Sequence, residues 1–283
     1  MKNTRNKLFK VAAILLIAGL LISFGSMIAI GFDFSKLDKN SYNEKSYTFT
    51  EDISSLSVTT IEADLNIIAS ESDSIKVSCM EKAENPFSIK VVNGTLTIGN
   101  HKKQLLDYLD IFSFTTPEIT IELPAKKYST IFADNTTGDI SVSSLEASDI
   151  IIDSGTGSID LCDVKCDNLE LELSTGDICL ERVSAVNYIE IESTTGDIDL
   201  NLALCKGEME IECTTGDITF SNSDANYISA ETTTGDITGT LVTEKTFYTK
   251  TTTGDINVPD STAENICELE TTTGDIDIKI AIN

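Results

Sequence analysis

The feature that most constrains this chain is a short motif that recurs at nearly constant intervals. A Thr-Gly-Asp-Ile core, with Ser in place of Asp in one copy, occurs eight times, and successive glycines are 19 or 20 residues apart. A period of about 20 residues predicts a stacked repeat architecture, in which each unit packs mainly against its neighbours. The repeated glycines are Gly138, Gly157, Gly176, Gly196, Gly216, Gly235, Gly254 and Gly274.

Apolar residues alternate with other residues on both sides of each glycine. Around Gly196 they lie seven and five positions before the glycine and two and four after it, at Ile189, Ile191, Ile198 and Leu200. Alternation with a period of two predicts strands that bury one face. The parity of the buried positions changes at the glycine, so the chain must bend there, and glycine supplies the conformational freedom for a corner.

We therefore predict an all-β fold, a β-solenoid (β-helix-like) of about eight coils of 19–20 residues over residues 131–283. Equivalent residues of neighbouring coils would lie about 4.8 Å apart. An antiparallel meander is the alternative arrangement, but it would not place identical residues beside each other.

Residues 46–130 are predicted to form degenerate first coils with a capping insert. Residues 60–67 read as a worn copy of the repeat, and residues 89–98 read as a hairpin around Asn93-Gly94, a favoured two-residue turn. Residues 104–116 are rich in aromatic and aliphatic side chains, so they would either cap the first coil or bind a partner.

Residues 11–32 contain no charged side chain. As a helix they would reach roughly 33 Å, which is enough to cross a membrane, and the basic residues 1–10 before them favour a cytoplasmic N-terminus. We therefore expect a single-pass signal anchor in the cell membrane, a linker over residues 33–45 and extracytoplasmic repeats. The alternative is a cleaved signal peptide with Ser23-Phe24-Gly25 as its cleavage site.

The composition argues against two classes of function. The chain has 46 acidic and 20 basic residues, and its only arginines are Arg5 and Arg182, so nucleic acid is not an expected partner. Catalysis needs an acid–base group of tuned pKa or an activated nucleophile, yet the single histidine, His101, lies outside the repeats. We expect no catalytic residues and no enzyme. An acid-pair glycoside hydrolase remains the remote alternative.

Two acidic columns are predicted to run along the solenoid. Like charges 4.8 Å apart repel by roughly 1 kcal/mol in water and by about 3 kcal/mol at an effective dielectric of 20. Backbone N–H groups at the corner with salt screening, divalent cations shared between coils, or a cationic partner could offset this repulsion. Beyond loosely bound divalent cations we expect no cofactor. The candidate metal ligands follow the glycines: Asp139, Asp177, Asp197, Asp217, Asp236, Asp255 and Asp275. The second column lies four residues before the glycines, with Lys250 in place of an acid in one coil: Asp134, Asp153, Glu172, Glu192, Glu212, Glu231 and Glu270.

Three further expectations concern individual positions. The Thr before each glycine should face inward by parity and form a hydroxyl ladder. The seven cysteines should be mostly free, because most of them take small or apolar inward positions. The final strand, residues 276–282, should be an open edge available for self-association.

These features together resemble a known bacterial family. The serial Thr-Gly-Asp-Ile cores, the worn first repeat and Ile119-Thr120-Ile121-Glu122-Leu123-Pro124 are similar to the "putative adhesin" family of β-strand-repeat envelope proteins (LiaG-like), over residues 46–283. The resemblance implies an extracytoplasmic location and a link to envelope-stress systems. We expect a non-enzymatic, membrane-anchored repeat protein, a scaffold or adhesin-like surface of the cell envelope. Its expected partner is an envelope protein or a cationic or wall polymer. The alternative is a sensory or regulatory ectodomain of an envelope-stress response.

Overall fold

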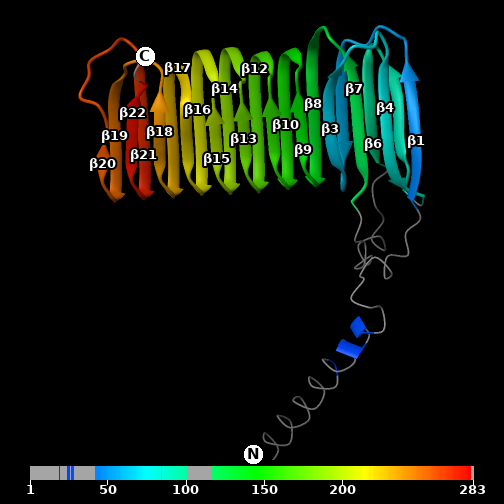
Figure 1. The fold of residues 1–283 in the computed structure, drawn as a ribbon, viewed down its shortest axis with the longest axis horizontal. Helices are drawn as coiled ribbons and strands as arrows, with labels where there is room; N and C mark the ends of the chain where they lie inside the picture. The colour runs from blue at the N-terminus through cyan, green and yellow to red at the C-terminus, as the bar shows by residue number, and fades with distance from the viewer. Residues whose placement is uncertain are drawn as a thin grey trace, which may run out of the picture. The chain divides into compact units, whose positions relative to one another are not determined.

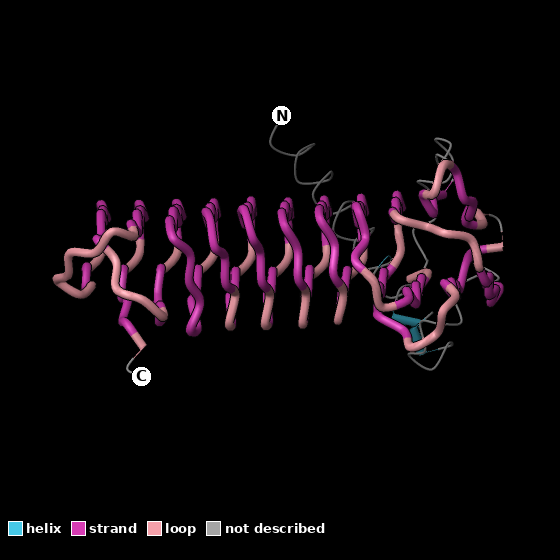
Figure 2. Tube along the Cα trace, turned by 90° about the horizontal axis from the view of Figure 1, so that it is seen from above, coloured by secondary structure: helices cyan, strands magenta, loops and turns pink. Residues whose placement is uncertain are grey.

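Alternating apolar residues build two β-sheets that face each other across a shared core (Figure 1). The computed structural model describes residues 42–83, 85–100 and 116–281, with five isolated positions at 19, 24, 25, 27 and 28. Apart from these positions, the described residues belong to one unit, residues 42–102 and 116–283. Seen from above, its coils lie side by side, and each crosses from one sheet to the other (Figure 2).

The repeats supply one long and one short strand to each coil, and all of them run parallel within their sheet. The long strands form sheet B: β8 (Lys127–Thr137), β10 (Glu146–Thr156), β12 (Lys165–Thr175), β14 (Ser184–Thr195), β16 (Leu204–Thr215) and the second half of β17 (Ile218–Thr234). The short strands form sheet A: β9 (Ile140–Ser143), β11 (Ile159–Cys162), β13 (Ile178–Glu181), β15 (Ile198–Asn201), the start of β17, and β18 (Ile237–Leu241). The parallel pairing confirms the predicted solenoid and excludes the antiparallel meander for these coils.

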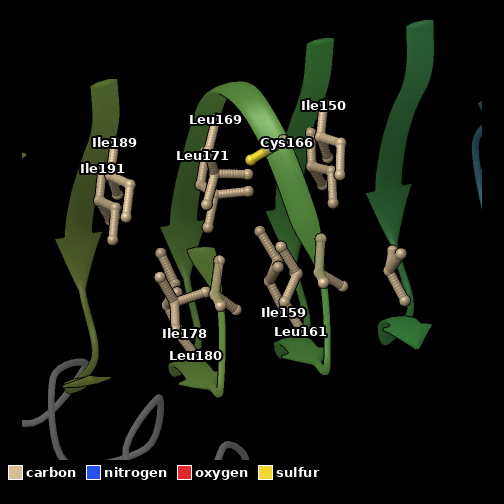
Figure 3. Packing of buried hydrophobic residues seen from close by; sticks show 14 of the residues in the cluster. Ile150, Ile159, Leu161, Cys166, Leu169, Leu171, Ile178, Leu180, Ile189 and Ile191 are labelled. Carbon is tan, nitrogen blue, oxygen red and sulfur yellow. The ribbon is translucent and has the colours of Figure 1, made fainter. Parts of the chain in front are cut away.

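Identical columns of apolar side chains fill the space between the sheets (Figure 3). Ile150, Leu169 and Ile189 pair in register along sheet B, while Ile159 and Ile178 pair along sheet A. All five are 0% exposed. Full burial of such a side chain contributes about 1.5–3 kcal/mol, so the core is built from many equal increments, one layer for each coil.

The N-terminal strands continue both sheets but introduce antiparallel pairs. β2 pairs in parallel with β8, and β3 pairs in parallel with β9. These pairings confirm that residues 60–67 belong to a degenerate first coil. β5 and β6 form the predicted hairpin, with positive φ at Asn93 (51°) and Gly94 (76°). β1 and β7 both pair antiparallel with β4. The bounds are β1 (Tyr42–Phe49), β2 (Ser55–Thr60), β3 (Asp64–Ser70), β4 (Ile75–Lys82), β5 (Phe87–Val92), β6 (Thr95–Asn100) and β7 (Glu118–Pro124).

The last strands are not stacked in chain order, so the prediction of an open edge at residues 276–282 is wrong. The strands are β19 (Thr246–Thr253), β20 (Ile256–Asn257), β21 (Ile266–Thr273) and β22 (Ile276–Ile280). β21 lies between β17 and β19, and β22 lies between β18 and β20. The outermost coil is therefore β19–β20.

The residues before β19 give a physical reason for this order. Nine residues after the glycine, earlier coils bury a small residue such as Ala185 or Ala225. The corresponding residue after Gly235 is Glu244, whose carboxylate would be costly to bury without a partner. Glu244 is exposed in the structure. The chain passes outward by one coil position, and the last coil fills the place left open.

Several predictions fall on residues outside those described: the anchor at residues 11–32, His101, and residues 104–115 of the insert. Among the described residues, no helix has the length and apolar character needed to span a membrane. All seven cysteines are free; five of them are buried, and Cys162 and Cys179 are partly exposed.

Candidate functional site: the two acidic columns

The glycine corner has no room for a side chain. The eight repeat glycines have φ between 129° and 153°. A Cβ atom on any of them would lie 1.8–2.2 Å from a carbonyl oxygen of the adjacent coil, as Gly196 shows with Gly176. Both the backbone conformation and the close approach of two coils require glycine. These glycines therefore lie where the chain turns from one sheet to the other and where adjacent coils approach most closely.

An Asp follows every repeat glycine except Gly157, which is followed by Ser158, and these Asp residues bind the neighbouring coils. Asp197 Oδ1 accepts the backbone N–H of Asp217 at 2.9 Å, and the N–H of Asp197 donates to Asp177 Oδ1 at 2.9 Å. Seven such bonds link the column, beginning at Asp64 of the worn first coil. The structure thus brings the candidate metal ligands together as a ladder of backbone acceptors. Within the described residues, no group of three or more His, Cys, Asp or Glu side chains is arranged to hold a metal ion.

The predicted hydroxyl ladder along all coils does not form; threonine hydroxyls bind the adjacent backbone in the last three coils, two residues earlier than predicted. The Thr immediately before each glycine is exposed, because the chain has already begun to turn at that position. The inward residue is three before the glycine. Thr232 Oγ1 donates to the carbonyl oxygen of Gly216 at 3.1 Å, and Thr271 Oγ1 donates to that of Gly235 at 3.0 Å.

The chain turns a second time six residues after the glycine, at a corner that was not predicted from the sequence. Its residue has φ between 52° and 58° in five coils, yet no residue type recurs there. Arg182 donates to Asp163 of the adjacent coil at 2.6 and 2.9 Å and so holds the pKa of that carboxyl below its usual range. The five residues are Ser144, Asp163, Arg182, Leu202 and Asn222.

Seven further carboxylates of the middle coils gather on the outer face of sheet B, which we call the carboxylate face. They form two columns in strict register, four and six residues before the glycine. Six of the seven accept no hydrogen bond and form no ion pair with any described residue; the exception is Glu170, which accepts the Tyr188 hydroxyl at 2.6 Å. The face comprises Glu170, Glu190, Glu210, Glu172, Glu192, Glu212 and Glu231.

Mutual repulsion marks this face. Partial burial and then the neighbouring Glu170 and Glu210 raise the pKa of Glu190. At the start of the same sheet, partial burial and then Asp153 raise the pKa of Asp134. Two grooves of about 250 and 350 Å³ follow the face. The smaller is lined by four of the carboxylates together with Ser and Thr, and the larger adds the apolar surface of Phe132 and Ile151.

The outer face of sheet A shows that the fold does not require such a charge density. The residues three positions after the glycine alternate in character; in successive coils they are Asp160, Cys179, Asp199 and Thr219. Both sheets bury equivalent apolar columns. The carboxylates of sheet B are therefore additional to what the solenoid needs, and they are open to positively charged groups.

Comparisons with known proteins agree with this architecture. A solved "putative adhesin" from Bacteroides fragilis has 16% sequence identity and a TM-score of 0.52, covering 84% of this chain and 97% of its own. Another from Parabacteroides distasonis has 12% identity and a TM-score of 0.46, covering 84% and 98%. The first of these supports the fold. No curated protein matches the sequence. The Toastrack DUF4097 family model matches residues 53–247 and 203–281, and the chain belongs to this family.

Proposed function

We propose that this protein is a non-enzymatic, membrane-anchored protein of the cell envelope that presents the carboxylate face to a cationic partner, as an adhesin-like or scaffold surface. One observation carries the proposal: six carboxylates without partners among the described residues stand in two columns on sheet B, while the equivalent outer face of sheet A is mixed. The name of the structural relative from Bacteroides fragilis, "putative adhesin", is in keeping with a surface role.

The proposed location rests on the N-terminal sequence. The uncharged residues 11–32 follow a basic segment, a pattern typical of an anchor with its N-terminus in the cytoplasm. The segment from residue 33 to the start of β1 at Tyr42 spans at most about 30 Å when extended. The repeats would then stand close to the outer surface of the membrane.

The partner is proposed to be an extended polymer or surface that carries many amino groups. Carboxylates recur about every 4.8 Å along each column, so several can be engaged by one flexible chain. A single exposed ion pair contributes only about 0–1 kcal/mol, and binding would depend on many simultaneous contacts. Such binding weakens as salt screens the charges.

The regularity of the face also favours binding over catalysis. Glycoside hydrolysis by two carboxyl groups needs one defined pair with different pKa values at a set separation. Here neighbouring coils repeat the same pair, for example Glu190 with Glu192 and Glu210 with Glu212. The pairs form a continuous array along sheet B instead of one isolated pair, and such an array suits binding at many points.

The test measures binding of the full-length chain, in detergent micelles, to poly-L-lysine and to poly-L-glutamate. The variant Glu190→Gln/Glu210→Gln removes two charges from the carboxylate face, and Asp160→Asn/Asp199→Asn removes two from sheet A. We expect binding to polylysine alone, with an affinity about tenfold lower, or about 1.4 kcal/mol, in the first variant. The second variant should change the affinity less than about twofold. Equal losses in both variants would show that only net charge matters.

A further inference from the structure

The last coil of the chain is an insert between two other coils. We call residues 266–280, which form β21 and β22, the inserted coil. The slot is the space it occupies, between β17–β18 on one side and β19–β20 on the other. In Figure 1 the red strands of the inserted coil lie between the orange and yellow strands of these two walls.

Both walls of the slot bind the inserted coil with the same bonds that join the other coils. Thr273 pairs with Thr234 of one wall and Thr253 of the other. The N–H of Asp275 donates to Asp236 Oδ1 at 2.7 Å, and Asp275 Oδ1 accepts the N–H of Asp255 at 2.8 Å. The slot is thus complementary to this one segment along both strands and at the glycine corner.

A buried ion pair joins the two walls without using the inserted coil. Lys245, directly before β19, is 0% exposed. Its Nζ donates to the carbonyl oxygen of Ala225 in β17 at 2.7 Å and forms an ion pair with Asp224. The N–H of Thr243 donates to Asp224 Oδ2 at 2.6 Å. The outer coil is therefore fastened to β17 whether or not its own inserted coil fills the slot.

The connection to the inserted coil leads back along the solenoid, whereas the connections of the regular coils lead forward. Residues 258–265, eight in number, link β20 to β21 and lead back by one coil. Between the equivalent positions of the first repeat, residues 142–148 make seven residues and lead forward by one coil. Coils with a 20-residue spacing have eight residues at the same place, for example residues 180–187, so the connection has the length of a regular one; fully extended it spans about 27 Å.

We infer that the slot is an interaction site for a second copy of this chain, which inserts its own residues 266–280, so that two copies exchange their last coils. Every hydrogen bond that the inserted coil makes to the walls of its own slot can also form with the slot of a second copy. Exchange of the coil between two copies therefore costs little free energy. Residues 258–265 are the hinge.

Shortening the hinge tests this inference. Deleting residues 260–264 from the full-length chain leaves three connecting residues, too few to return to the slot of the same molecule. We expect this variant to sediment as a dimer in detergent micelles, while its β21 amides keep their protection against hydrogen exchange. A monomer with protected β21 amides, or the loss of that protection without dimerisation, would contradict the exchange.

A second variant separates exchange from other contacts. Adding Gly274→Ala to the deletion places a Cβ 1.9 Å from the carbonyl oxygen of Gly235, so the coil cannot seat in either copy's slot. This double variant should be monomeric, with hydrogen exchange in β12–β16 unchanged as evidence that the other coils are folded. A dimer that persists with Gly274→Ala would place the interface elsewhere and overturn the inference.

Discussion

The glycine corner and the carboxylate face both carry columns of acidic residues, but the structure treats their carboxylates in opposite ways. At the corner, Asp197 Oδ1 accepts the backbone N–H of Asp217 in the next coil, and the N–H of Asp197 donates to Asp177 Oδ1 in the preceding coil. On the face, Glu190 and Glu212 accept no hydrogen bond from any described residue. Two columns that look alike along the chain are therefore a structural element and an exposed surface of unpaired carboxylates, which is the surface that we propose for binding.

This difference shows which positions of the repeat are constrained by packing and which positions can accept different residue types. Corner residues contact two coils at once, and a side chain at the glycine would collide with the backbone of the adjacent coil. Side chains on the outer face touch only their column neighbours, and sheet A shows that neutral residues are accepted in equivalent places. Acidic residues that the fold does not need are the ones available for function.

The largest expected effect is at the corner glycine. Gly196→Ala would place a Cβ 1.8 Å from the carbonyl oxygen of Gly176 and should lower the free energy of unfolding by more than about 3 kcal/mol. Leu202→Ala, at the second corner with φ 54° and an exposed side chain, should change it by less than about 1 kcal/mol. Urea unfolding of both variants makes the comparison; equal losses would mean that close packing does not distinguish the corners.

A smaller effect is expected for the corner carboxylate. Asp197→Ala removes the acceptor for the N–H of Asp217 and should cost about 1 kcal/mol, whereas Asp197→Asn keeps an acceptor oxygen and should be nearly neutral. Glu212→Ala on the face removes no hydrogen bond and should not destabilise the protein. A loss for Glu212→Ala as large as that for Asp197→Ala, in the same unfolding assay, would erase the distinction between the columns.

The face should respond to loss of charge in the opposite direction. Glu190→Gln relieves repulsion from Glu170 and Glu210, so it should raise the free energy of unfolding by about 1 kcal/mol at low salt. The gain should shrink toward zero in 0.5 M salt, where the Debye length is only about 4–5 Å. Thermal unfolding at the two salt concentrations checks this, and a gain that does not depend on salt would point to a cause other than repulsion.

The smallest effect is a pH dependence that also separates the two kinds of carboxylate. The pKa of Glu190 and that of Asp134 are raised in the folded protein, so their stabilising contribution is complete below the unfolded pKa values and is lost as pH rises through the folded ones. Lysine and arginine partners lower the pKa of Asp163 and Asp167, which lose stability as pH falls through their folded pKa values.

Stability should therefore rise slightly as pH falls from 7 toward about 4.5 and then decline below about 3.5, where the paired carboxylates become protonated. Denaturant unfolding across this range measures the profile. Glu190→Gln should flatten the rise between pH 4.5 and 7 and leave the acid limb unchanged. An unaltered rise in this variant would rule out Glu190 as one of its sources.

The parts of the fold that sequence could predict are those in which one residue type serves one physical need. The glycine corner has no room for a side chain, and the inward columns must be apolar. Both requirements therefore produce residue types that recur in the sequence. The second corner needs only a positive φ, which Ser144, Arg182 and Leu202 all adopt, and it left no shared residue type.

The strand order could have been suspected from Glu244, which interrupts a column of small buried residues. The strand order could not be derived from Glu244 alone. An acidic residue at a buried position indicates that the chain does not form a regular coil there, but it does not indicate which segment takes the open place. The roles of the two acidic columns required the register between coils. Only that register reveals that Asp197 meets a backbone N–H and Glu190 meets other carboxylates.

Binding of poly-L-lysine to two variants of equal charge tests this division of roles most directly. Asp197→Asn/Asp217→Asn removes two charges from the corner, and Glu190→Gln/Glu210→Gln removes two from the face, both in the full-length chain at low salt. We predict that the corner variant binds within about twofold of the unmodified protein, while the face variant binds about tenfold more weakly. A corner variant that loses as much affinity as the face variant, or more, would contradict the assignment of the binding surface to sheet B.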